Sequence, residues 1–291
     1  MDISPSLVKE LREKTSAGMM DCKKALAETS GDMEKAIDFL RKQGLSTAAK
    51  KAGRVAADGT IGFTIDDKGS FGAMVEVNCE TDFVTKTDGF QQYVKELTEV
   101  LRLNNVADID ALMAASVKGS TMREVQTALV VKIGENLGAR RFVRWQSNGA
   151  GQKIAQYIHA GNKIGVMVRF TDPTDKLAMT LAREVAMHVA AMNPSYVRKE
   201  DIPESVLAKE KEIMLAQMGD MKKPPEIMDK IAAGKVAKYV NDVCLDNQIF
   251  VRDPEGKTTV AQVLATIDQG IRIEEFVRLQ VGEGIEKKQE A

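Results

Sequence analysis

The spacing of hydrophobic residues changes several times along this chain, and each change predicts a different kind of element. The first 47 residues hold three short segments whose apolar positions recur three and four residues apart, as on one face of a helix. Ser4 and Pro5 mark the first helix start, since the hydroxyl suits a cap and proline suits the first turn. A basic stretch, 48–54, reads as a helical linker. We therefore expect residues 1–55 to form a three-helix bundle with its linker.

The next segment, 56–140, alternates apolar and polar residues before the helical period returns. Alternation over 59–65 and 71–78, separated by an Asp-Asp-Lys-Gly turn, predicts a β-hairpin. A corner and an amphipathic helix over 90–101 follow. We expect this segment to form the first core subdomain, a hairpin covered by helices.

The order of hairpin, corner and helix occurs a second time. Alternation over 153–170 predicts another hairpin, and the corner from Thr171 to Pro173 leads into another amphipathic helix. This repetition predicts an internal duplication, with related α+β subdomains over 56–140 and 141–258. Each subdomain is expected to contain an antiparallel sheet.

The composition becomes heavily charged between residues 197 and 239. Pro224 and Pro225 divide this stretch, and a proline pair cannot continue a helix. We predict two antiparallel helices that fold into a projecting coiled-coil hairpin over 197–239. Two ordinarily packed helices are the alternative, because the heptads are irregular. Residues 259–291 are expected to form a C-terminal helix and tail module.

Side-chain caps mark further helices. Thr121 lies three residues before Glu124, the spacing of a capping box, and predicts a helix that ends at Gly138. Thr258 is expected to cap a later helix, and the final strand shifts its apolar phase at Glu274-Glu275, which indicates a bulge. Together the elements predict an α+β fold built from several modules.

Composition narrows the class of protein. The 291 residues include 41 basic and 42 acidic side chains, a formal charge of -1, which argues against binding nucleic acid mainly by neutralising phosphates. Cys22, Cys79 and Cys244 show no CxxC spacing, so neither a disulfide framework nor a zinc site is indicated. Without a leader pattern or a long apolar run, we expect a cytoplasmic protein that does not enter membranes.

No residue pattern indicates catalysis or a bound cofactor. The sequence has no P-loop, and its two histidines, His159 and His188, have no partners at metal-ligand spacing. His188 falls near an apolar helix face, as a packing histidine does. His159 precedes a Gly-Asn turn, where it is either a partner contact or a plain turn residue. We therefore predict a protein that is not an enzyme and holds neither a cofactor nor a metal.

One stretch, Val75 to Val84, departs from the composition of an ordinary loop. It begins as a strand and ends with Asp82 and Phe83 at a strand-to-helix corner, where an exposed aromatic side chain is unusual. The second corner has Pro173 in place of Phe83. A phenylalanine gains roughly 1.5 to 3 kcal/mol on burial, so only the first corner offers an apolar wedge to a partner.

Two classes of function remain open on these patterns. In the first, the modules jointly grip another protein, and Met19 and Met20 are either core filling or a docking surface, since thioethers suit adaptable contacts. The second is a non-catalytic RNA-binding or chaperone-like protein. The basic residues available for nucleic acid are Lys50, Lys51, Arg54, Arg140, Arg141 and Arg144. Few aromatic residues are interleaved with them, which favours the first class.

Several runs of residues resemble the bacterial elongation factor Ts family, the guanine-nucleotide exchange factors of elongation factor Tu. They are Leu7 to Arg12, Gly18 to Leu26, Glu76 to Val84 and Val281 to Lys287. The resemblance covers essentially the whole chain. It implies an N-terminal bundle like a ubiquitin-associated domain, a duplicated core, a coiled-coil insertion and a C-terminal module.

The resemblance also implies a partner and a mechanism. The partner is elongation factor Tu, in its GDP-bound and nucleotide-free forms, with no direct contact to nucleic acid. Phe83 is implied to wedge between partner helices while Asp82 disturbs the Mg²⁺ bound with GDP. The residues implied at the interface are Thr81, Asp82, Phe83, Val84 and, less directly, Met19, Met20 and His159.

Overall fold

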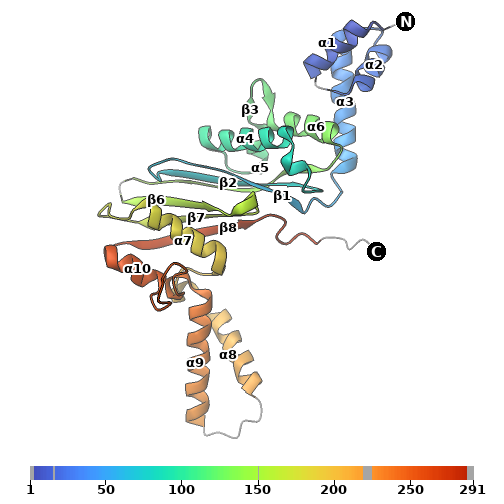
Figure 1. The fold of residues 1–291 in the computed structure, drawn as a ribbon. Coiled ribbons are helices and arrows are strands. Elements are labelled where there is room, and N and C mark those ends of the chain that lie inside the picture. Colours follow the sequence, from blue (N-terminus) through green and yellow to red (C-terminus); the bar gives the residue numbers. More distant parts are fainter. Residues whose placement is uncertain (1–2, 16, 150, 219–224, 287–291) are drawn as a thin grey trace.

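The computed structural model describes residues 3–15, 17–149, 151–218 and 225–286. A helical bundle lies at one end of the molecule, two small sheets with their covering helices form the middle, and two paired helices project at the other end (Figure 1). The chain is therefore α+β and built from several modules, as the hydrophobic pattern predicts.

Three helices form the N-terminal bundle: α1 (Pro5–Thr15), α2 (Met19–Glu28) and α3 (Met33–Lys51). Their apolar faces meet around Leu11, Cys22 and Leu26, which are fully buried. α3 runs on past the bundle to the first core unit (Figure 1), where Arg41 forms an ion pair with Glu124. Most of the predicted basic linker is thus the last part of this helix.

The first core unit contains the antiparallel sheet β1 (Asp58–Ile65), β2 (Phe71–Cys79) and β5 (Leu137–Gln146), in the order β1-β2-β5. Its other elements are α4 (Asp88–Leu103), α5 (Ile109–Ala114), the small strands β3 (Ser116–Val117) and β4 (Ser120–Thr121), and α6 (Met122–Ile133). The helices bury Phe90, Tyr93 and Leu97 against one face of the sheet. The expected hairpin of β1 and β2 is confirmed.

The second core unit has the sheet β6 (Gln152–Ile158), β7 (Ile164–Thr171) and β8 (Arg272–Gln280), in the order β6-β7-β8. Its helices are α7 (Met179–Met192) and α10 (Val260–Ile267). In both sheets a third strand pairs with the second strand of a hairpin, so the topology repeats as a duplication would. The domain boundaries stay a prediction, but β8, expected in a separate C-terminal module, completes the second sheet.

The two sheets pack face to face. Ile61 and Met74 of the first sheet and Ile154 and Met167 of the second are buried in one cluster between them. Gly165 allows the close approach, since an added Cβ there would lie 2.8 Å from side-chain atoms of Ile61 and Met74. Every residue of β2 is buried, because helices cover one of its faces and the second sheet covers the other.

The predicted bulge in the final strand is confirmed. Arg169 of β7 pairs with Glu275, whereas the next residue, Phe170, pairs with Ile273. Glu274 is therefore the extra residue that shifts the apolar phase of β8.

Helices α8 (Glu204–Met218) and α9 (Pro225–Val243) lie side by side and project from the second core unit (Figure 1). The two expected helices are confirmed, and their coiled-coil packing stays a prediction. The turn predicted between them at 219–225 lies outside the described residues, except for Pro225, which begins α9. At the base of the pair, Ile202, Val240 and Cys244 form a small buried cluster.

Two predicted helix limits are wrong. α6 ends at Ile133 rather than Gly138, because Gly134 closes it in the left-handed conformation with a φ of 84°. The residues that follow are thereby released to form β5. α10 is capped by Thr259 rather than by Thr258, one residue later than the hydroxyl pattern predicts.

Candidate partner-binding surface

The motif loop, residues 80–87, turns the chain from β2 into α4. The N–H and the hydroxyl of Thr85 both donate to the carbonyl oxygen of Asp82, at 3.2 and 2.6 Å. The hydroxyl of Thr87 donates to the carbonyl oxygen of Val84 at 2.8 Å and also caps α4. These local hydrogen bonds stabilise the tight turn from Asp82 to Thr87.

Phe83 and Val84 occupy opposite environments within this loop. Phe83 is 74% exposed, whereas Val84 is only 4% exposed and belongs to the core of the first unit. Lys86 lies above the Phe83 ring, 5.7 Å from its centroid, and 3.5 Å from the carboxylate of Asp82. Val84 thus anchors the loop and leaves Phe83 in solvent. A contact of Val84 with a partner stays a prediction.

The corner of the second unit turns its acid inward. The carboxylate of Asp172 is buried, accepts the N–H groups of Lys176 and Leu177 at 3.1 and 2.9 Å, and lies 2.8 Å from Lys153. Burial alone would raise the pKa of Asp172, but Lys153 and the two N–H donors outweigh it and lower the pKa. Asp82, by contrast, has a half-exposed carboxylate. Only the first corner presents an acid and an aromatic side chain to solvent.

A turn after α6, the anchor turn Gly134–Asn136, holds the motif loop from the side. The carboxylate of Glu135 accepts hydrogen bonds from the N–H and the hydroxyl of Thr81, and the N–H of Asn136 donates to Glu80 at 2.6 Å. Sequence reasoning missed both residues because it continued the helix through them. The glycine that opens the turn was the available signal, since glycine commonly ends a helix.

His159 lies at the same end of the two sheets as the motif loop. Lys163, which follows the turn between β6 and β7, donates to the carbonyl oxygen of Gly59 at 2.8 Å. Gly59 lies near the start of β1, and Asp58 there pairs with Cys79 at the end of β2. His159 precedes the same turn and is exposed, as expected. Its role as a partner contact stays a prediction.

Met19 and Met20 lie apart from this end, in the first turn of α2 on the N-terminal bundle. Both side chains are exposed, and neither fills the bundle core around Cys22. The core-filling alternative is therefore wrong. The pair forms an apolar patch of flexible side chains, the kind that suits adaptable contacts.

The basic residues considered for nucleic-acid binding are largely engaged within the protein. Arg140 and Arg141 contact the buried carboxylate of Glu76 at 3.1 and 2.6 Å. Arg144 donates to a backbone carbonyl at 2.9 Å, and Lys51 donates to the backbone of the anchor turn. The Glu76 carboxylate offsets charge on Arg140 and Arg141, and the backbone contacts occupy donor groups of Arg144 and Lys51 that phosphates would otherwise use, which disfavours the RNA-binding alternative.

The predicted packing role of His188 agrees with the structure. Its ring is fully buried, with Nε2 2.9 Å from Gln248 and Nδ1 accepting the N–H of Val251 at 3.1 Å. Burial lowers the pKa of His188, which therefore packs as a neutral ring.

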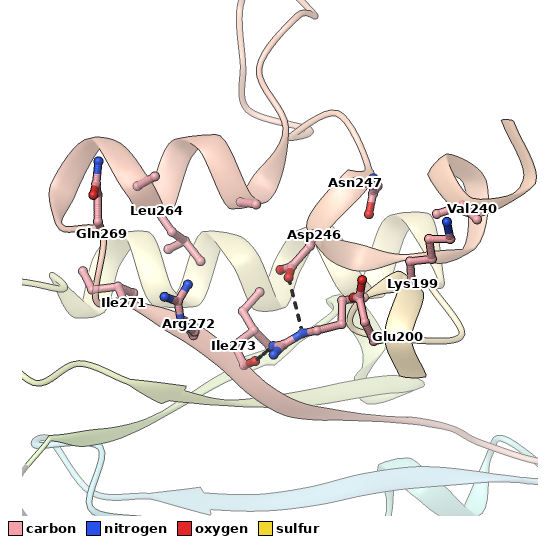
Figure 2. Close-up of a pocket in the computed structure, with 13 residues that line it drawn as sticks. Lys199, Glu200, Val240, Asp246, Asn247, Leu264, Gln269, Ile271, Arg272 and Ile273 are labelled. Carbon is pink, nitrogen blue, oxygen red and sulfur yellow. Dashed lines mark hydrogen bonds and ion pairs between the residues drawn. The ribbon is translucent and has the colours of Figure 1, made fainter. Parts of the chain in front are cut away.

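A pocket of about 810 Å³ lies away from the motif loop, at the base of the helical pair (Figure 2). Arg198 lines it, lies 3.7 Å from the carboxylate of Asp246, and donates to the carbonyl oxygen of Ile273. Burial raises the pKa of Asp246, and Arg198 offsets part of that effect. Among the described residues that line the pocket there is no histidine or cysteine. It offers no nucleophile-histidine pair.

The described part of the chain holds neither a cluster of metal-ligating side chains nor a helix suited to crossing a membrane. No group of three or more His, Cys, Asp or Glu side chains there is arranged to hold a metal ion. No helix within those residues combines the length and the apolar character needed to cross a membrane.

Comparisons with known proteins agree with one another. The family model described as elongation factor TS matches residues 80–283, from the motif loop to the segment after β8. Similar proteins named elongation factor Ts occur in Thioalkalivibrio sulfidiphilus (45% identical, covering 100% of this chain and 96% of the relative), Clostridioides difficile (44%, covering 99% and 96%) and Hydrogenovibrio crunogenus (46%, covering 98% and 94%). The chain therefore belongs to the elongation factor Ts family, a family of translation factors and not of enzymes.

Proposed function

We propose that this protein is a cytoplasmic guanine-nucleotide exchange factor that binds elongation factor Tu, and that its motif loop promotes GDP release by disturbing the partner's Mg²⁺ site. Membership of the family supports the partner. The observation that carries the mechanism is the exposed ring of Phe83 beside the half-exposed carboxylate of Asp82, on a loop anchored through Val84.

The chemistry of the partner's site explains why a wedge is sufficient. Mg²⁺ demands near-ideal octahedral geometry, so a small shift of the helices that support its ligands weakens both the ion and the phosphates it bridges. In this proposal Phe83 supplies the apolar contact that moves those helices, and Asp82 brings a negative charge toward the ion. No covalent step is required.

Thermodynamic linkage then gives a complete exchange cycle. If binding of the factor lowers the affinity of elongation factor Tu for GDP by a given ratio, binding of GDP lowers its affinity for the factor by the same ratio. Nucleotide that rebinds therefore ejects the factor. The protein acts by shifting an equilibrium, which agrees with a family that is not enzymatic.

Capture by purified elongation factor Tu tests the partner. We expect strong retention of this protein on nucleotide-free elongation factor Tu and progressive release as GDP and Mg²⁺ are added, because linkage makes the two ligands antagonistic. The RNA-binding alternative predicts no protein partner that responds to nucleotide. Retention that does not change with GDP, or no retention at all, would overturn the proposal.

Removal of residues 1–50 should weaken complex formation more than it destabilises the core. The buried residues of the bundle form a cluster distinct from that of the first unit. Ala48 of α3 also packs against the first unit, so we expect the sheets to keep most, but not all, of their packing without residues 1–50. We expect the dissociation constant measured by calorimetry to rise about tenfold, with the core still unfolding cooperatively.

A substitution within the intact bundle is the sharper control. Met19→Ser with Met20→Ser removes the exposed apolar patch and leaves the buried residues of the bundle in place. The dissociation constant of this double variant for elongation factor Tu should rise, as that of the deletion does. A dissociation constant equal to wild type in both proteins would count against a binding role for the bundle.

A further inference from the structure

One side chain from a distant part of the sequence holds the entry to the motif loop. In Glu135, Oε2 accepts the N–H of Thr81 at 3.0 Å and Oε1 accepts the Thr81 hydroxyl at 2.7 Å. Hydrogen bonds to an ionised carboxylate are stronger than neutral ones, and a pair of them fixes orientation as well as position. Thr81 is thereby held by both its main chain and its side chain.

The anchor turn that carries Glu135 is itself fixed at both ends. On one side the N–H of Gly134 donates to Val130 at 2.9 Å and closes α6. On the other side Leu137 is buried in β5 and pairs with Cys79 at the end of β2. Glu135 therefore lies on a short bridge between a helix and a strand that are both packed into the core.

The same turn also contacts the end of the linker from the bundle. The side-chain amide of Asn136 donates to the carbonyl oxygens of Arg54 and Ala52, at 2.8 and 3.4 Å. Lys51, the last residue of α3, donates to the carbonyl oxygen of Gly134. These contacts add further restraints on the turn, so Glu135 is presented from a rigid element.

We propose that Glu135 is a positioning residue for nucleotide exchange, which fixes Thr81 so that Asp82 and Phe83 approach the partner in one orientation. The inference rests on the proposed function of the motif loop. Val84 anchors the middle of that loop in the core, whereas its entry is anchored by the contact of Glu80 with Asn136 and by that of Thr81 with Glu135. Without Glu135 the entry to the loop samples more conformations. The entropy lost when the loop becomes ordered then raises the free energy of the step in which Phe83 enters the partner.

The second corner supplies a natural comparison. There the hydroxyl of Thr171 donates to Glu274 at 2.6 Å, so a threonine and a glutamate meet at both corners. Only the first corner has the exposed Phe83 and a carboxylate that also takes the threonine N–H. Loss of Glu274 therefore tests what a similar contact contributes to the fold alone.

The experiment compares full-length Glu135→Gln, Glu135→Ala and Glu274→Gln with wild type. Release of fluorescent GDP from elongation factor Tu is followed by stopped flow at increasing factor concentration, which separates the maximal rate from the half-saturating concentration. We expect the maximal rate to fall roughly threefold for Glu135→Gln, since an amide oxygen accepts one of the two hydrogen bonds, and roughly tenfold for Glu135→Ala. Half-saturation should change less, and Glu274→Gln should match wild type in both parameters.

Hydrogen exchange in the free protein gives a readout that needs no partner. The Thr81 amide should exchange faster in Glu135→Ala, while the amides within β2 keep their wild-type protection. This result separates a loosened loop from a loosened sheet. Equal loss of protection across β2 would show a general structural role and overturn the inference.

The remaining outcomes are equally decisive. If wild type stimulates GDP release and both Glu135 variants reach the same maximal rate, the inference is overturned and the proposed function stands. A wild-type protein that does not stimulate GDP release overturns the proposed function, and the inference falls with it. Equal slowing in Glu274→Gln also contradicts a role specific to the motif loop.

Discussion

We expect Phe83→Ala to slow the factor-stimulated release of GDP from elongation factor Tu by about ten- to a hundredfold, while the free protein stays folded. A buried phenylalanine gains roughly 1.5 to 3 kcal/mol, and each 1.4 kcal/mol changes a rate or an equilibrium about tenfold. In the free protein the ring is 74% exposed, so its removal costs the fold little. Stopped-flow release of a fluorescent GDP measures the effect directly.

The matched control for this substitution is Phe63→Ala. Phe63 is a second exposed phenylalanine, 45% accessible, on strand β1 of the same sheet. Its removal makes the same chemical change without altering the motif loop, so release should stay within about twofold of wild type. Unchanged release in Phe83→Ala would refute the wedge.

The contribution of charge can be separated from that of the ring. Asp82→Asn removes the negative charge and keeps the size of the side chain, and combination with Phe83→Ala completes a double-mutant cycle. If Asp82 and Phe83 act on the same step, the two losses in rate will not add. If the two losses are additive, Asp82 acts on the Mg²⁺ ion and Phe83 acts on the partner helices in independent steps.

We expect the stability of the core to depend strongly on the buried side chain of Glu76. Its fully buried carboxylate accepts hydrogen bonds from Arg141 at 2.6 Å, Arg140 at 3.1 Å, the N–H of Gly282 at 2.8 Å and Asn78 at 3.1 Å. A register shift in β5 beside Glu76 lets the two consecutive arginines reach the same carboxylate. The contacts join β2, β5 and the segment after β8.

Glu76→Ala should lower the free energy of unfolding by about 3 kcal/mol, because it removes the carboxylate that accepts from Arg140, from Nε of Arg141 and from the N–H of Gly282. Arg141 keeps its contacts with Gln280 and Glu283. This value lies at the low end for buried ion pairs, since water reaches the partly exposed arginines. Urea denaturation followed by circular dichroism gives the difference. As a control, Glu99→Ala removes an exposed ion pair with Arg102 on α4 and should change the free energy of unfolding far less than Glu76→Ala does. Equal stability of the two variants would contradict the assignment.

The pH dependence of the Glu76 contribution has a defined sign. Burial alone would raise the pKa of Glu76, but the hydrogen bonds from Gly282, Arg141 and Asn78 outweigh it and hold the pKa below its ordinary value of 4.5. The folded state therefore binds a proton less readily than the unfolded chain. The stability difference between wild type and Glu76→Gln should be constant above about pH 5 and shrink as the pH falls below 4.5.

The local pattern of the sequence is sufficient for much of this fold. Alternation predicts both hairpins, helical periods predict the bundle and the helical pair, and a phase shift predicts the bulge at Glu274. Each of these signals depends on residues a few positions apart, where backbone geometry leaves few choices. The comparison of Phe83 with Pro173 likewise identifies the motif loop without coordinates. Identity of the partner enters through family membership and not through any of these patterns.

Only the tertiary structure shows which residues far apart in the sequence contact one another. Alternation on β2 separates Glu76 from its apolar neighbours, but only the packing of a second sheet shows that both faces are buried and that the carboxylate needs two arginines. The contact of Glu135 with Thr81 depends on where Gly134 stops α6 and on the register of β5 against β2. The place of β8 depends on pairing with a strand about one hundred residues earlier in the chain. Periodicity reports which side of an element is apolar, whereas the partner of that side is chosen by packing over the whole chain.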